Sequence, residues 1–167
     1  MSDHQLAEWL PAATPALAAA IVRRALLDVG IVEIPPGSNR SPRIDEYCLA
    51  AKVPVGSYWC AAAVAAWWRE SGAEIPAYPA GCDEWMAWAR QTHRWATTPA
   101  AGAAVLYGKP GDASHIGVVV RVTPMLLSCE GNTSFGGYTR NGVGVALKEV
   151  DTARVLGYVL PMPGGGT

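Results

Sequence analysis

A cysteine and a histidine in this sequence occupy positions that suit nucleophilic catalysis. Cys60 precedes an alanine-rich run, so it opens the helix that this run predicts. The first turn of a helix can stabilise a thiolate and hold a developing oxyanion on its N–H groups. His115 starts an apolar segment after a turn, where an imidazole can project from a sheet edge toward a helix. Each residue alone also fits a structural role, Cys60 as a small buried side chain and His115 as a surface histidine.

A group that could orient the imidazole follows a later strand. Glu130 and Asn132 are two residues apart, so both would face the same side of an extended segment. Either side chain could accept the N–H of His115 and hold the ring in the tautomer that faces the thiol. The alternative is that Asn132 belongs to a turn, for which the sequence after Gly131 is well suited. The residues alone leave this choice open.

Several further residues are candidates for contact with a substrate. Tyr58 lies two positions before the thiol, so its hydroxyl is a candidate second donor to an oxyanion. Trp59, Trp67 or Trp85 could pack against glycan or peptide in a groove; the alternative is core packing, which we favour for Trp67. Asn39 lies in a Pro-Gly loop and could line the site, or it could simply form the turn.

Helices are predicted in the first part of the chain. Apolar residues recur at helical spacing over residues 15–29, and Gly30 offers a stop. Ser41 and Pro42 are typical of a cap and first position, so they begin a second helix. The Cys60 helix ends before Gly72, and residues 81–93 predict a fourth helix with acidic residues in its first turn.

After Pro99 the pattern changes to short apolar runs with β-branched residues, separated by turn residues. These runs predict strands at residues 103–107, 115–122, 125–129, 142–150 and 155–160. Helices followed by strands predict an α+β fold, with the N-terminal helices packed on a C-terminal antiparallel sheet. We expect one domain over residues 1–167, with a core of about 17–161 and a short flexible tail at 162–167.

The composition excludes several classes of protein. The 167 residues are half hydrophobic and carry 13 basic against 14 acidic side chains, for a net charge of −1. We therefore expect no binding to nucleic acid. No apolar run reaches the roughly 18–20 residues that span a bilayer, so we expect a soluble protein without membrane insertion. Residues 11–22 lack a preceding basic region, so we expect synthesis in the cytoplasm without a signal peptide.

The cysteines are widely spaced and form no CxxC pair, which argues against a zinc cluster. A chain of this length can build its own core, so it does not require a disulfide framework. We expect all four to be reduced thiols in the cytosol: Cys48, Cys60, Cys82 and Cys129.

Three segments, in chain order, resemble the CHAP family of cysteine, histidine-dependent amidohydrolases/peptidases. They are Tyr58-Trp59-Cys60-Ala61-Ala62, His115-Ile116-Gly117-Val118-Val119 and Glu130-Gly131-Asn132-Thr133. The order Cys, His, Glu/Asn is that family's order. The likeness extends to segments near Asn39 and Tyr158, and it covers roughly residues 17–161.

This resemblance implies a papain-like α+β fold and hydrolysis of an amide bond in peptidoglycan. The bond would lie in a stem peptide, in a cross-bridge or between sugar and peptide. By position, Cys60 matches the nucleophile, His115 the general base, and Glu130 or Asn132 the orienting residue. Some relatives hold calcium in an acidic loop before the nucleophile. Here only Asp45 and Glu46 precede it, on a predicted helix, so we expect no metal and no cofactor.

Several biological settings fit these expectations. A phage endolysin would be made without a signal peptide, and it would reach the wall through holin lesions as a monomer. An antibacterial effector amidase would be delivered by a secretion machine. From a different class, the chain would be a catalytically silent CHAP-like module that binds wall or a partner protein.

Overall fold

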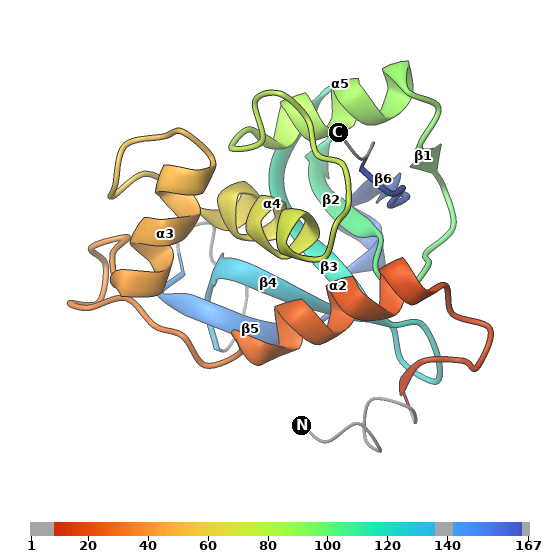
Figure 1. The fold of residues 1–167 in the computed structure, drawn as a ribbon, viewed down its shortest axis with the longest axis horizontal. Coiled ribbons are helices and arrows are strands. Elements are labelled where there is room, and N and C mark those ends of the chain that lie inside the picture. The colour runs from red at the N-terminus through yellow and green to blue at the C-terminus, as the bar shows by residue number, and fades with distance from the viewer. Residues whose placement is uncertain (1–8, 136–141, 165–167) are drawn as a thin grey trace.

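Four helices come before a six-stranded antiparallel sheet in the part of the chain that the computed structural model describes, residues 9–135 and 142–164 (Figure 1). The helices are α2 (Ala16–Leu27), α3 (Pro42–Ala50), α4 (Cys60–Glu70) and α5 (Cys82–Gln91). The strands are β1 (Trp95–Ala96), β2 (Ala104–Lys109), β3 (Asp112–Arg121), β4 (Leu127–Thr133), β5 (Gly144–Glu149) and β6 (Val155–Val159), with the short 3-10 helix η1 (Thr152–Arg154) before β6. The predicted α+β fold is confirmed.

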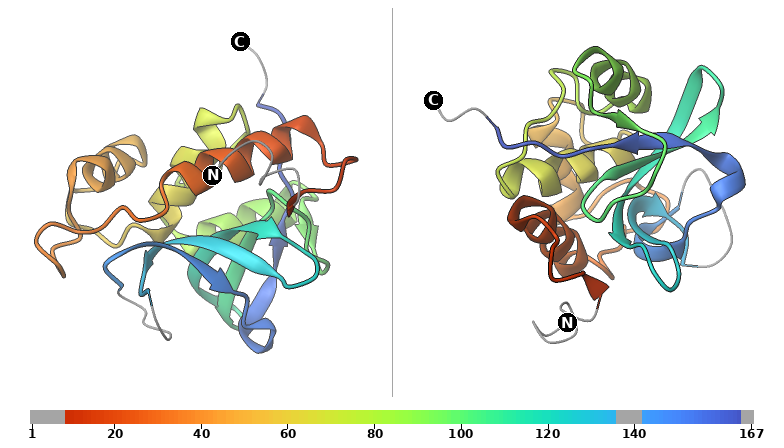
Figure 2. Two further views of the ribbon diagram at one scale, coloured as in Figure 1. Left: turned by 90° about the horizontal axis from the view of Figure 1, so that it is seen from below. Right: turned by 90° about the vertical axis from the view of Figure 1, so that its right-hand side faces the viewer.

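The sheet has the strand order β1-β6-β2-β3-β4-β5, and every neighbouring pair is antiparallel. Helices α2, α3 and α4 form a layer on one side of it, as the left panel of Figure 2 shows. A small second cluster, which includes Val105, Tyr107, Val119 and Tyr158, forms apart from the main core. Strands β2 and β3 therefore have buried side chains on both faces.

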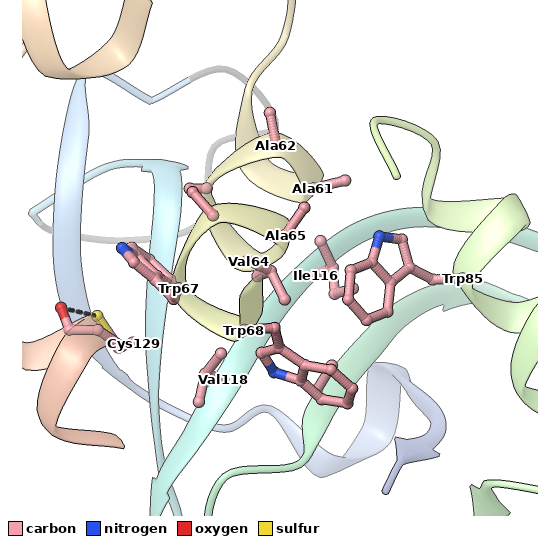
Figure 3. Close-up of a cluster of buried hydrophobic side chains, with 14 of the residues drawn as sticks. Ala61, Ala62, Val64, Ala65, Trp67, Trp68, Trp85, Ile116, Val118 and Cys129 are labelled. Atoms are coloured by element: carbon pink, nitrogen blue, oxygen red, sulfur yellow. Dashed lines mark hydrogen bonds between the residues drawn. The ribbon is translucent and has the colours of Figure 1, made fainter. Parts of the chain in front are cut away.

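Helix α4 is the centre of the helical layer. It contacts α2, α3, β3 and β4, and every residue from Ala61 to Trp68 is buried. A helix that is apolar on all sides is stable only when neighbours cover all of it. Figure 3 shows Ile116 and Val118 of β3 directed at α4, with Trp68 and Trp85 packed beside it. The alanines let the backbones of α4 and the sheet approach closely, so the position of Cys60 follows from this packing.

A buried carboxylate joins the three helices of this layer. Asp28, the C-cap residue of α2, is 6% exposed. Its oxygens accept hydrogen bonds from Trp67 Nε1 of α4 (2.8 Å), from the Tyr47 hydroxyl of α3, and from Arg43 and Arg24. Burial would raise the pKa of Asp28, but the hydrogen bonds from Tyr47 and Trp67 and the two arginines lower it below its ordinary value. The charge is therefore stabilised where it ties the helices together.

Strands β2, β3 and β4 extend beyond the apolar runs that predicted them, whereas β5 and β6 lie within theirs. Strand β2 continues to Lys109 and pairs with Asp112, because the ladder of a tight hairpin uses backbone groups and does not need apolar side chains. Strand β4 likewise continues to Thr133 along β5. The sequence did not predict β1, since Trp95–Ala96 is too short to show a period.

Part of the tail expected to be flexible is hydrogen bonded. The Glu74 N–H donates to the carbonyl of Met162 at 3.0 Å, and the Gly164 N–H donates to Gly72 at 2.9 Å. Residues 162–164 thus lie against the loop after α4, in contrast to the expectation, and residues 165–167 are outside the described part. No helix among the described residues is long and apolar enough to cross a membrane.

We predict that Asp28→Asn lowers the free energy of unfolding by about 3 kcal/mol, because it removes the charge that two arginines, a tyrosine and a tryptophan share in a buried site. The measurement is chemical denaturation followed by tryptophan fluorescence. Asp45→Asn is the matched control, since its partner Arg40 is exposed and its removal should leave the midpoint close to that of the parent. Equal midpoints for Asp28→Asn and the parent would contradict the stabilising role of Asp28.

Candidate active site

Cys60 is the first residue of α4, as the sequence predicts. The N-cap residue Trp59 makes no side-chain hydrogen bond to the helix, and the first intrahelical bond runs from the Ala63 N–H to the Trp59 carbonyl at 2.9 Å. The N–H groups of the first turn therefore have no acceptor within the helix and point out of its N-terminal end, where they can donate to another group. The Ala61 N–H hydrogen bonds to the Cys60 sulfur and lowers the pKa of the thiol.

The side chain of Trp59 packs in the core beneath this turn. Its side chain is fully buried at 0% exposure, and its Nε1 donates to Glu33 Oε1 at 3.1 Å. Its ring stacks on Tyr47 with centroids 6.0 Å apart. A Cβ added at Gly131 would lie 2.8 Å from the Trp59 ring, so only glycine lets β4 pass this close. The expectation that Trp59 lines a groove is wrong, because the core encloses the ring.

His115 lies on β3 opposite Tyr107 and is 2% exposed. Its Nε2 is 3.0 Å from Glu130 Oε2. Since Nε2 is engaged by the carboxylate, Nδ1 is the nitrogen left for Cys60, to which His115 is also hydrogen bonded. The structure therefore brings together the cysteine, the histidine and the carboxylate that the sequence placed 55 and 70 residues apart along the chain.

Glu130 is held in place by its own neighbours. It is 5% exposed, and Oε1 accepts a hydrogen bond from Ser128 Oγ at 2.7 Å. Its side chain crosses Gly117 of β3, where an added Cβ would lie 2.6 Å from the Glu130 Cγ. The crossing therefore needs a glycine two residues after His115. The Ser128 hydroxyl in turn lies 3.1 Å from the Tyr107 hydroxyl.

The pKa values of Cys60 and His115 shift in opposite directions. Hydrogen bonding to the Cys82 thiol is the largest cause that lowers the pKa of Cys60; burial opposes it, and His115 lowers the pKa further, to well below its ordinary value. Burial alone would lower the pKa of His115, but hydrogen bonds and charges from Cys60 and Glu130 raise it to about 10. Both shifts favour a thiolate on Cys60 beside an imidazolium on His115.

Asn132 lines the same cavity as the thiol, and its amide is not hydrogen bonded to the imidazole. It adopts a left-handed backbone with φ of 53°, at an irregularity in the pairing of β4 with β5 between Glu130 and Thr133. This irregularity breaks the strand alternation on which the shared face of Glu130 and Asn132 was predicted. Glu130 is the residue bonded to His115. Both polar atoms of the Asn132 amide are buried without a hydrogen-bond partner.

A cavity of about 330 Å³ opens at the sulfur. Its wall includes residues before the thiol, at the start of α5 and at the start of β3: Tyr58, Cys60, Cys82, Asp83, Ser114 and Asn132. Tyr58 is 64% exposed there, so it is accessible to a substrate. On the imidazole side a second cavity, of about 310 Å³, is lined by His115, Glu130 and charged residues that include Lys148 and Arg154.

Two other candidate residues do not join the site. Asn39 lines neither cavity, and its φ of 55° fits the turn interpretation. Trp85 is fully buried, with its Nε1 donating to the Pro79 carbonyl at 2.8 Å, so it packs in the core. Among residues 9–135 and 142–164, no group of three or more His, Cys, Asp and Glu side chains could hold a metal ion.

Sequence reasoning missed three residues that shape the site. Cys82 opens α5 in the same way that Cys60 opens α4, so the same signal was present in the sequence. Gly117 interrupts an apolar strand, which is a known sign of close approach by another group. Glu33 carried no signal, because its partner Trp59 lies 26 residues away.

Comparison with known proteins agrees with the geometry. The family model described as the CHAP domain matches residues 52–132, a segment that runs from the loop before Cys60 to Asn132. A search of curated proteins and a search of solved structures each gave no match. The helices on an antiparallel sheet fit the papain-like fold that the resemblance implied. The match over residues 52–132 therefore confirms the resemblance to the CHAP family of cysteine, histidine-dependent amidohydrolases/peptidases.

Proposed function

We propose that this protein hydrolyses an amide bond of peptidoglycan, with Cys60 as nucleophile, His115 as general acid and base, and Glu130 as the residue that orients His115. One observation carries the proposal: a thiol at the start of α4 is hydrogen bonded to an imidazole whose other nitrogen is 3.0 Å from a buried carboxylate. This is the arrangement that activates a cysteine for attack on a carbonyl. The CHAP domain supports peptidoglycan as the substrate class.

In the first half of the reaction the Cys60 thiolate attacks the carbonyl carbon of the amide, and the π electrons of the C=O bond move to the oxygen. His115 then gives its Nδ1 proton to the leaving nitrogen as the C–N bond breaks, which leaves a thioester on Cys60. In the second half His115 takes a proton from water, the hydroxide attacks the thioester, and the thiolate leaves. Glu130 stays ionised throughout. Burial alone would raise its pKa, but His115 and the hydrogen bond from Ser128 together lower that pKa below its ordinary value.

Two donors are proposed for the oxyanion. One is the Cys60 N–H in the open first turn of α4. The other is the Asn132 amide, which lies in the wall of the Cys60 cavity with its polar atoms unpaired. A buried amide without a partner costs free energy in the resting protein, and a ligand oxygen would recover part of that cost. Tyr58 is exposed on the same wall, which suits contact with the substrate chain.

The biological setting we propose is that of a phage endolysin or a similar lytic enzyme. It would be made in the cytoplasm and would reach the wall through holin lesions, or through a secretion machine if it is an effector. A holin gene beside the coding sequence supports the endolysin setting, whereas an immunity gene supports the effector setting. Mass spectrometry of digested peptidoglycan identifies the bond that is cut.

We predict that Cys60→Ala and His115→Ala each abolish the release of new amino termini from purified peptidoglycan, because each removes one half of the thiolate and imidazolium pair. His93→Asn is the matched control for the histidine, since His93 is exposed with φ of 58°, a backbone that Asn tolerates. It should digest wall like the parent. Undiminished digestion by Cys60→Ala would exclude the mechanism.

Glu130 and Asn132 should give different kinetic signatures. Glu130→Gln removes the charge that supports the imidazolium, so we expect kcat to fall roughly 10²- to 10⁴-fold and the alkaline limb of the pH profile to move to lower pH. Asn132→Gly suits the local φ of 53° and removes only the amide; we expect kcat to fall roughly 10²-fold with the pH profile unchanged. If Asn132→Gly moved the alkaline limb and Glu130→Gln left the pH profile unchanged, Asn132 would be the orienting residue.

The ionisation of Cys60 can be measured without a substrate. We expect iodoacetamide to alkylate Cys60 rapidly at pH 6, where an ordinary thiol is only roughly 0.3% ionised. His115→Ala should slow this alkylation at least roughly tenfold, because the pKa of Cys60 rises once the imidazolium is lost. Hydrolysis by the parent should decline as the pH passes about 10, where His115 loses the proton that the leaving amine needs. Slow alkylation of the parent at pH 6 would indicate a silent binding module.

A further inference from the structure

Two sulfur atoms lie together at the mouth of the candidate site. Cys60 Sγ and Cys82 Sγ are 3.9 Å apart. They are the first residues of α4 and α5, both are partly exposed, and both line the 330 Å³ cavity. The other cysteines, Cys48 and Cys129, are buried. Cys60 and Cys82 are thus the two thiols that a small oxidant from solvent reaches together.

We propose that Cys60 and Cys82 form a redox modification site, at which a hydroperoxide oxidises Cys60 and Cys82 then closes a reversible disulfide. The inference goes beyond amide hydrolysis. It rests on the proposed function only in requiring that Cys60 is a thiolate, which is the form that reacts with peroxides.

The chemistry balances with hydrogen peroxide as the oxidant. The Cys60 thiolate attacks one peroxide oxygen, the O–O bond breaks, and the products are a sulfenic acid on Cys60 and hydroxide, which takes up a proton to become water. Cys82 sulfur then attacks Cys60 sulfur, the S–S bond forms, and the S–O bond breaks. The departing hydroxide takes the Cys82 proton and leaves as a second water. Two thiols are oxidised by two electrons, and one peroxide is reduced to two waters.

The structure holds Cys82 where this second step needs it. The next residue, Asp83, accepts a hydrogen bond from the Ala113 N–H at 2.7 Å, which ties the first turn of α5 to the start of β3. His115 lies two residues further along the same strand. The sulfurs must approach by roughly 2 Å to reach the disulfide length, a distance that side-chain rotation can supply. The first turn of α5 is therefore anchored beside the site, and the proposal requires side-chain rotation to bring the sulfurs together.

The disulfide would have two effects on the enzyme. It would remove the nucleophile, so hydrolysis would stop. It would also consume the sulfenic acid before further peroxide converts it to sulfinic acid, from which dithiol reductants do not recover the thiol. A reducing compartment would keep the pair as thiols, and exposure to peroxide would switch activity off reversibly.

The test treats the whole protein with hydrogen peroxide and maps tryptic peptides by mass spectrometry before and after dithiothreitol. Arg69 lies between the two cysteines, so trypsin places them on separate peptides that only a disulfide joins. We expect the joined peptide in the peroxide-treated parent, a loss of activity of at least roughly tenfold, and recovery with dithiothreitol. The joined peptide is read without any substrate, so failure of the hydrolysis assay does not affect it.

Cys82→Ser is the decisive variant, and Cys48→Ala is its matched control. Each is compared with its own untreated activity. Cys82→Ser should lose activity in peroxide, carry sulfinic acid on Cys60 and fail to recover, whereas Cys48→Ala should behave like the parent, because Cys48 is buried on α3. Sulfinic acid on Cys60 of the parent without any joined peptide would overturn the proposal. Equal recovery of Cys82→Ser and the parent would overturn it as well.

Discussion

The whole site depends on how closely α4 can lie against the sheet. Its small residues and Gly131 of β4 allow an approach at which an added Cβ on Gly131 would lie 2.9 Å from the Cβ of Ala63. Because this contact lies one turn from Cys60, it fixes the sulfur relative to β3 and β4. The Trp59 ring packs against the same contact, and Asp28 and Glu33 accept hydrogen bonds from the indole N–H groups of Trp67 and Trp59. The packing of α4 on the sheet thus determines the position of the Cys60 sulfur, independently of any electrostatic interaction in the site.

Burial strengthens the electrostatic interactions in the site, and it also requires that each charged group has a partner. Glu130 and His115 are almost fully enclosed, and a buried charge is stable only when it is paired and hydrogen bonded. Ser128 and His115 bond to Glu130, and Cys60 bonds to the other side of the imidazole. Each charge therefore depends on its neighbour. Asn132 alone remains unpaired in this region of the described chain, which is why we assign it to the substrate and not to the resting network.

The first turns of two helices meet at this point, and each begins with a cysteine. The arrangement serves the thiolate of Cys60, since the Cys82 thiol is the largest of the causes that lower its pKa. In the redox proposal, the same proximity lets Cys82 form a disulfide with Cys60 after peroxide has oxidised Cys60. The hydrogen bond between Asp83 and the start of β3 holds the first turn of α5, and with it Cys82, beside Cys60. In our proposal this one placement both lowers the pKa of Cys60 and makes Cys60 sensitive to peroxide.

The sequence by itself determined the α+β class, the helix that Cys60 opens, and the order of cysteine, histidine and carboxylate along the chain. These features are local, because helical periodicity, caps and β-branched runs are written in neighbouring residues. It left open whether Glu130 or Asn132 orients His115, and it wrongly placed Trp59 at a groove. Only the tertiary structure decided these points. An irregularity in the pairing of β4 with β5 separates Glu130 from Asn132, the core encloses Trp59, and Cys82 of another helix lies beside Cys60. Such contacts join residues far apart in the chain, so their geometry is set by packing between elements and has no signature in either segment alone.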